Sequence, residues 1–239
     1  MLKRSHIVIA KRTLSIIDSE NNSIKINKIA YLFGSIAPDL NCIYPTHTIS
    51  NTFKRFSNRL NRVDNIQNNL VISFTLGVIT HYICDYFCYA HNLGKVDPMH
   101  AVYERLLRPH IIKHEEIFEL PEYAEVKKHW EYIKEHIRDY DYVEVTSGYS
   151  EEYIAKAIEA IHFKSGDHIE DILKSLAILH KSYMEESFNL GLEGWYNQKL
   201  RMLHDEVYSH LVCCEVLNSL INSRSYLQIN QYKVTEESL

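Results

Sequence analysis

The sequence predicts an all-α protein, a single-domain bundle of about eight helices. Seven glycines and five prolines are about 5% of the 239 residues, whereas an average chain carries roughly 12%. So few turn-forming residues exclude a sandwich of many short strands, a collagen-like repeat and a low-complexity linker protein. Apolar residues recur at helical spacing, and most of the remaining breakers fall between these stretches.

Four helices are expected in the first 90 residues. Ser5 is a typical cap for the first helix, Pro38 stops the second, and Asp64 or Asn65 caps the fourth. The third helix is basic, and the fourth is apolar over most of its length. Their expected ranges are 5–19, 24–36, 49–62 and 65 to about 89, with a loop at 41–48.

The fourth of these helices resembles a membrane span in length. Residues 70–90 come close to the roughly 20 residues that cross a bilayer. Asp85 would be costly in lipid, however, and no basic flank follows the stretch. A helix that is apolar all round is also what the centre of a bundle needs. We therefore expect a buried helix rather than a membrane span.

The second half of the chain predicts further helices. Asn92-Leu93-Gly94 ends the long helix, and Asp97 with Pro98 opens the next one, which runs to about Lys113. No repeat and no domain linker is found, so we expect one domain over residues 1–225 and a poorly ordered tail over 226–239. The remaining expected helices span 121–139, 151–163, 167–188 and 195–225.

Charge and cysteine content limit the class of partner and the compartment. The net charge of −5 argues against a general polyanion-binding protein. Residues 1–62 nevertheless carry ten Lys/Arg and three Asp/Glu, which suits a phosphate-bearing ligand or an anionic surface, or simply a solvated face. No signal peptide is seen, because Lys11 and Arg12 interrupt the first apolar stretch. Five cysteines without a CxxC pair predict a reduced, cytoplasmic protein, with secretion by another route left open.

Histidine–carboxylate pairs carry the candidate chemistry among the 14 histidines. His81 and Asp85 lie four residues apart on an expected helix, so they share one face. His100 and Glu104 repeat the spacing at the start of the next helix, and His91 lies between the two pairs. One such pair would also fit a hydrogen-bonded pair in a core. Two pairs so close together favour a metal site, since zinc accepts both imidazole and carboxylate ligands.

Three further candidate ligands lie upstream, at the start of the first helix, at the end of the second and in the following loop. They are His6, Asp39 and His47. Each alone would also fit a capping histidine, a turn aspartate or a surface histidine. Cys84 and Cys88 fall on one side of the long helix and are expected in the core, although Cys88 could instead touch the metal pocket.

Four segments, in the same order, resemble the zinc-dependent bacterial phospholipases C, a family distantly related to P1-type single-strand nucleases. The two histidine–carboxylate segments are the most specific, because spacing and residue type both match. The C-terminal half matches only as helices of suitable length. The four segments are residues 5–10 (SHIVIA), 34–39 (GSIAPD), 81–85 with His91-Asn92, and 100–104 (HAVYE).

The resemblance implies a polynuclear zinc site inside the bundle, with two or three ions. One zinc would be held by His47, His81 and Asp85, a second by His91, His100 and Glu104, and a third by His6 and Asp39, with Asp85 bridging. In secreted members the third zinc also binds the amino group and carbonyl of an N-terminal tryptophan. Here Met1 stands five residues before His6, so that site is weaker, absent or completed by the Met1 amino group.

The resemblance also implies the reaction, hydrolysis of a phosphodiester such as the glycerol–phosphate bond of a phospholipid, with transient contact to a membrane surface. Asp39 would orient or deprotonate the attacking water. A P1-like nuclease or small-molecule phosphodiesterase on the same fold is one alternative, although the negative body disfavours long nucleic acid. A non-catalytic helical metal-binding protein is another. Eight candidate ligands for two or three ions leave open coordination positions, which favours catalysis.

Overall fold

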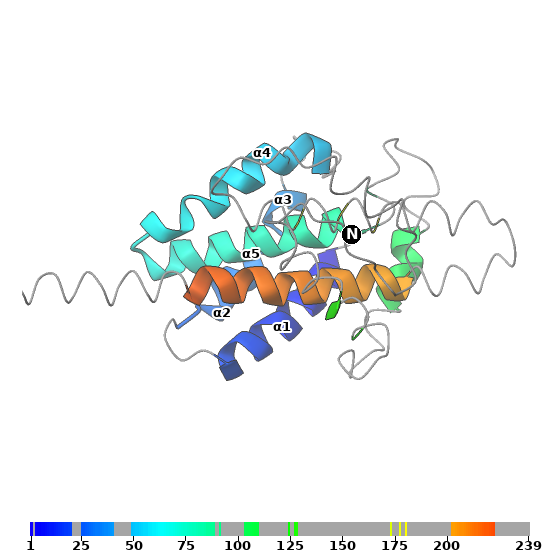
Figure 1. Ribbon diagram of the computed structural model, residues 1–239, viewed down its shortest axis with the longest axis horizontal. Helices are drawn as coiled ribbons and strands as arrows, with labels where there is room; N and C mark the ends of the chain where they lie inside the picture. The colour runs from blue at the N-terminus through cyan, green and yellow to red at the C-terminus, as the bar shows by residue number, and fades with distance from the viewer. Residues whose placement is uncertain are drawn as a thin grey trace, which may run out of the picture. The chain divides into compact units, whose positions relative to one another are not determined.

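The computed structural model describes residues 1, 3–20, 25–40, 49–88, 91, 103–109, 124, 127–128, 173, 177, 180 and 202–222. These residues form helices, turns and short extended connections, with no β-strand among them (Figure 1). The predicted all-α class is therefore confirmed for this part of the chain. The number of about eight helices stays a prediction, because most of the expected helices after residue 110 lie outside the described residues.

The chain divides into two compact units. The first comprises residues 1–85 and 212–239, and the second comprises residues 86–211. The single domain expected over residues 1–225 stays a prediction, and the expected tail lies outside the described residues. Each unit is described by itself.

Helix α1 (Lys3–Glu20) opens the first unit and lies close to the predicted range. One face of α1 is buried: Ile9, Thr13, Leu14 and Ile17 are each at most 3% exposed. Burial of these side chains holds α1 against the rest of the unit.

Two predicted boundaries near residue 30 are wrong, for local reasons. Helix α2 (Lys28–Gly34) begins four residues later than expected, because the Asn27 side chain accepts a hydrogen bond from the Ala30 N–H (3.0 Å) and caps it there. Pro38 does not end helical structure. It lies in the first turn of the short helix α3 (Ala37–Leu40), where a missing N–H costs nothing.

The next elements are α4 (Ile49–Leu60), the 3₁₀ turn η1 (Val63–Asn65) and α5 (Asn69–Tyr86). The predicted cap of the long apolar helix at Asp64 or Asn65 is wrong, because those residues belong to η1. Asn68 caps α5 instead: its side-chain oxygen accepts from the N–H groups of Leu70 (2.9 Å) and Val71 (3.3 Å).

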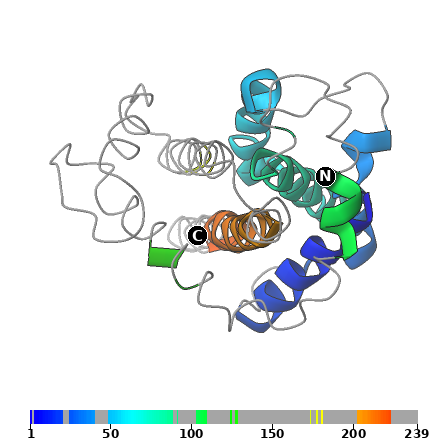
Figure 2. The same ribbon diagram turned by 90° about the vertical axis from the view of Figure 1, so that its right-hand side faces the viewer.

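Helix α5 forms the centre of the first unit, with α4 and α1 on opposite sides of it (Figure 1 and Figure 2). From Ile72 onward nearly every residue of α5 is buried, as expected for a helix that is apolar all round. The ring of Phe56 on α4 packs edge-on against Tyr82, with centroids 6.5 Å apart. None of the helices among the described residues is long and apolar enough to cross a membrane.

Helix α2 approaches α5 backbone to backbone through two glycines. A Cβ on Gly34 would collide with the carbonyl oxygen of Phe74, and one on Gly77 would collide with the carbonyl oxygen of Tyr31. The Tyr31 hydroxyl also hydrogen-bonds Thr80 Oγ1 at 2.9 Å. This close contact fixes the start of the segment that leads to Asp39.

The second unit contains a hydrogen-bonded network of three polar side chains. The hydroxyl of Tyr103, in the helix of residues 103–109, donates to Asp205 Oδ2 (2.8 Å). The other oxygen of Asp205 lies 2.8 Å from His180 Nε2. Because Tyr103 precedes Glu104, the network anchors the helix turn that carries this predicted ligand.

Candidate metal centres

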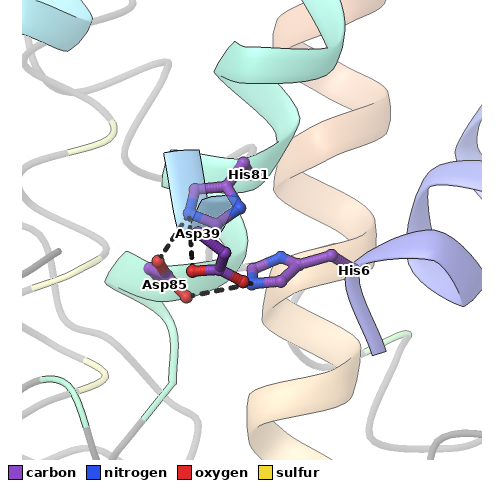
Figure 3. A group of neighbouring side chains, drawn as sticks. All are labelled: His6, Asp39, His81 and Asp85. Atoms are coloured by element: carbon purple, nitrogen blue, oxygen red, sulfur yellow. Dashed lines mark ion pairs between the residues drawn. The ribbon is translucent and has the colours of Figure 1, made fainter. Parts of the chain in front are cut away.

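The first candidate centre lies in the first unit and joins three helices. His6 from α1, Asp39 from α3, and His81 and Asp85 from α5 each offer a donor atom within 4.8 Å of the others (Figure 3). We call these residues the four-residue cluster. Three of them are fully buried, whereas the Asp39 side chain is 20% exposed.

His81 is oriented by the backbone that precedes Asp39. Its Nδ1 lies 3.0 Å from the Ser35 carbonyl oxygen and donates its proton there. Its Nε2 then faces Asp85 Oδ2 at 3.0 Å and Asp39 Oδ1 at 3.7 Å. A carbonyl that fixes the far nitrogen of a histidine is the usual support of a metal-binding imidazole.

His6 approaches the same carboxylates from the other side. Its Nε2 lies 3.3 Å from Asp85 Oδ1 and 3.9 Å from Asp39 Oδ2. The rings of His6 and His81 stack with centroids 4.1 Å apart. Each oxygen of Asp85 therefore faces a different histidine (Figure 3).

The backbone of Met1 adds two further polar groups to this centre. Its amino group lies 2.7 Å from Asp85 Oδ1, and its carbonyl oxygen accepts from His6 Nε2 at 3.1 Å. The carbonyl oxygen carries lone pairs that can bind a metal ion, and the amino nitrogen gains one when it loses its proton. The Met1 backbone thus lies against Asp85 and His6.

The electrostatics of the cluster separate the two histidines. Burial would lower the pKa of His6, but the attraction of Asp85 and the hydrogen bond to it outweigh burial and raise the pKa from 6.5 to about 10. Burial, followed by repulsion from charged His6, lowers the pKa of His81 to about 4. At neutral pH His6 is therefore protonated and charged, whereas His81 is neutral.

This proton arrangement fits a metal ion. Neutral His81 keeps its proton on Nδ1, so the lone pair of Nε2 points at Asp85 Oδ2 only 3.0 Å away. Two buried acceptors that face each other repel unless a cation lies between them. Two imidazoles and two carboxylates are ligands that zinc accepts. The residues of the four-residue cluster therefore fit the metal that the sequence predicts.

The second candidate centre lies in the second unit and comprises Cys88, His91 and Glu104, which we call the three-residue cluster. Their donor atoms also lie within 4.8 Å of one another. His91 Nε2 is 3.0 Å from Glu104 Oε1, and all three side chains are buried. A thiol, an imidazole and a carboxylate are again a donor set that zinc accepts.

The structure brings six of the eight predicted ligands into these two clusters. His47 and His100 lie outside the described residues, so their roles stay predictions. Two contributors lie outside the eight predicted ligands, although the sequence leaves each open as an alternative: Cys88 and the Met1 amino group. The Cys-x-x-His spacing of Cys88 and His91 is a signal for the first. No local signal marks Met1, since only folding brings it to Asp85.

Comparison with known proteins gives one match. A model of the zinc-dependent phospholipase C family matches residues 5–190. The chain belongs to this family. No curated protein and no solved structure matches it.

Membership of the zinc-dependent phospholipase C family supports zinc as the metal and a hydrolase as the class of enzyme. The match begins at Ser5, one residue before His6, and includes every predicted ligand up to Glu104. Both candidate centres therefore fall inside the matched region.

Proposed function

We propose that this protein is a zinc-dependent phosphodiesterase that cleaves the glycerol–phosphate bond of phospholipids. The observation that carries the proposal is the four-residue cluster, in which Ser35 orients His81 toward two buried carboxylate oxygens. Family membership supports the same reaction class.

In this proposal His6, His81 and Asp85 would hold zinc, and each oxygen of Asp85 faces a different one of the two histidines. The carbonyl oxygen and amino group of Met1 lie beside His6 and Asp85 and would add donor atoms there. When bound, zinc lowers the pKa of water toward ~7 and stabilises negative charge on phosphoryl oxygens. The buried residues of the cluster position this charge and exclude bulk water from its far side.

Asp39 is the residue of the cluster that would contact the substrate. It is the one member of the cluster with solvent access, at 20% exposure against 0% for the others. Its carboxylate orients the attacking water and accepts its proton. The water oxygen bonds to phosphorus, the bond from phosphorus to the glycerol oxygen breaks, and that oxygen takes a proton. The products are diacylglycerol and the phosphorylated headgroup.

An apolar groove in the first unit supports contact with a lipid surface. It lies between α2 and the start of α5 and is lined almost entirely by apolar side chains. Ile29 is 82% exposed and Phe33 52%, which is unusual for such large apolar residues. The exposed Lys28 adjoins them. Apolar side chains beside a lysine suit the headgroup region of an anionic bilayer.

Parallel assays with one protein preparation test the proposed reaction. The full chain is assayed on short-chain phosphatidylcholine, bis-p-nitrophenyl phosphate and single-stranded DNA, before chelation, after chelation and after zinc is restored. We expect zinc-dependent release of phosphocholine at the highest rate. Faster hydrolysis of DNA than of phosphatidylcholine would indicate a nuclease rather than a phospholipase. Zinc binding without hydrolysis of any substrate would indicate a non-catalytic metal-binding protein.

A further inference from the structure

We infer that Cys88 is a thiolate ligand of the metal held by His91 and Glu104. The inference rests on the proposed function in that it concerns zinc in this protein. It adds a sulfur ligand where the sequence predicts only histidine and carboxylate. The three donor atoms lie within 4.8 Å of one another, and Cys88 is fully buried.

The local backbone points the two residues of Cys-x-x-His to one side. Helix α5 ends at Tyr86, and the His91 N–H then donates to the Cys88 carbonyl at 2.9 Å. This bond closes a turn between residues three apart, which brings their side chains together. Short Cys and His spacings of this kind are typical of zinc ligands.

The distances between the donor atoms of Cys88, His91 and Glu104 are close to those around a bound zinc ion. Four donors at zinc distances of ~2.0–2.3 Å lie roughly 3.3–3.8 Å apart in a tetrahedron. His91 Nε2 and Glu104 Oε1 are already 3.0 Å apart, and no pair in the group exceeds 4.8 Å. Small side-chain rotations therefore suffice to place all three donors around one ion.

Glu104 is held in place from behind. The preceding residue, Tyr103, donates to Asp205, which in turn pairs with His180. All three cluster members are at most 9% exposed. Without a metal, the Cys88 thiol is a neutral buried group beside the His91–Glu104 pair. With zinc it becomes a charged ligand, because thiols lose their proton on metal binding.

A thiolate changes what this centre does. Sulfur donates more electron density than imidazole, so it favours softer ions such as Cd²⁺ and makes the site sensitive to oxidation. It also occupies a coordination position that would otherwise be open to water. We therefore expect this ion to be held more tightly than that of the four-residue cluster and to exchange more slowly.

Cobalt substitution tests the assignment without relying on activity. The full chain is stripped of zinc and titrated with Co²⁺. A thiolate ligand gives a charge-transfer band in the near ultraviolet, whereas visible d–d bands report cobalt with any ligands. We expect both in the unmodified chain. Cys88→Ala and Cys88→Ser should lose the near-ultraviolet band and keep visible bands, with affinity lower by about 10-fold or more.

Cys214→Ala is the matched control, because Cys214 is also a buried thiol and belongs to neither cluster. This variant should keep the near-ultraviolet band. Visible bands without a charge-transfer band in the unmodified chain would overturn the role of Cys88, as would a band that persists in Cys88→Ala. Those results would leave the phosphodiesterase standing if zinc-dependent hydrolysis is retained. Absence of any cobalt binding would overturn both proposals.

The first readout comes from the unmodified chain, so the test does not depend on a variant that folds. A ¹¹³Cd NMR spectrum of the same protein gives an independent check. Resonance in the shift range of sulfur-ligated cadmium supports the inference. A spectrum with only nitrogen- and oxygen-ligated cadmium overturns it.

Discussion

The carbonyl oxygen of Ser35 accepts a hydrogen bond from Nδ1 of His81, across 46 positions of sequence, at 3.0 Å. The carbonyl belongs to the turn between α2 and α3, and the same turn leads to Asp39. One backbone group thus sets the tautomer of His81, a predicted metal ligand, and leads to the carboxylate of Asp39 that faces it. The geometry of the centre depends on how closely α2 packs against α5.

His81→Ala should remove zinc and phosphodiesterase activity together. The substitution deletes the imidazole between Asp39 and Asp85, so we expect a loss of about one equivalent of zinc. Activity should fall on the order of 100-fold or more. Thr75→Ala, at another buried position of α5 whose hydroxyl donates to the Val71 carbonyl of the same helix, is the control and should retain its zinc. Unchanged zinc content and activity in His81→Ala would contradict the assignment of the site.

Asp39→Asn should affect turnover more than metal content. The amide keeps the size of the side chain but cannot accept the proton of water, so kcat should fall by about 10²–10³-fold. Zinc held by the buried residues should remain measurable by elemental analysis. Asp18→Asn removes an exposed carboxylate from α1 and should leave kcat unchanged. A wild-type kcat in Asp39→Asn would exclude Asp39 as the base.

Zinc binding to the four-residue cluster should release a proton from His6. The pKa of His6 in the metal-free protein is about 10, and imidazole must lose its proton to bind zinc. The proton competes with the metal, so apparent affinity should rise as pH rises toward 10, by about tenfold per unit for one proton. Calorimetry in buffers of different ionisation enthalpy counts the protons. His6→Ala should release about one fewer, and equal counts would contradict the prediction.

Gly34→Ala or Gly77→Ala should destabilise the first unit. In each case the new methyl would collide with backbone of the facing helix, which cannot rotate away. We expect a loss of about 2–3 kcal/mol in the free energy of unfolding, measured in urea. Zinc affinity should fall as well, because α2 carries the turn that orients His81. Asn58→Ala, on the exposed side of α4, should change stability by less than ~0.5 kcal/mol.

Ile29→Ser combined with Phe33→Ser should weaken binding to vesicles. Both side chains are exposed in the apolar groove, and losing their insertion into lipid should cost about tenfold or more in affinity. Sedimentation with phosphatidylcholine–phosphatidylserine vesicles measures this. Lys28→Glu should weaken binding to anionic vesicles further, whereas Lys11→Glu, the same charge change on exposed α1, should do so less. Equal effects of the two lysine variants would argue against a specific docking surface.

The sequence alone determined the all-α class and the buried nature of the long apolar helix, and it predicted a set of metal ligands whose roles stay predictions. These follow from local rules: scarce breakers, apolar periodicity, and the i, i+4 spacing that places His81 and Asp85 on one face. Exact helix ends did not follow, because Asn27 and Asn68 competed with other plausible caps and tertiary contact decided among them.

Only the tertiary structure decided how the ligands group. His6 and Asp39 have no local pattern that separates them from a cap and a turn residue, and they meet His81 because α1 and α3 pack beside α5. The Ser35 carbonyl and the Met1 backbone join the site for the same reason, since backbone groups carry no residue-type signal. The sequence left Cys88 either in the core or at the metal pocket, and the structure places it beside His91 and Glu104. Metal sites are assembled across long sequence separations, so packing determines them.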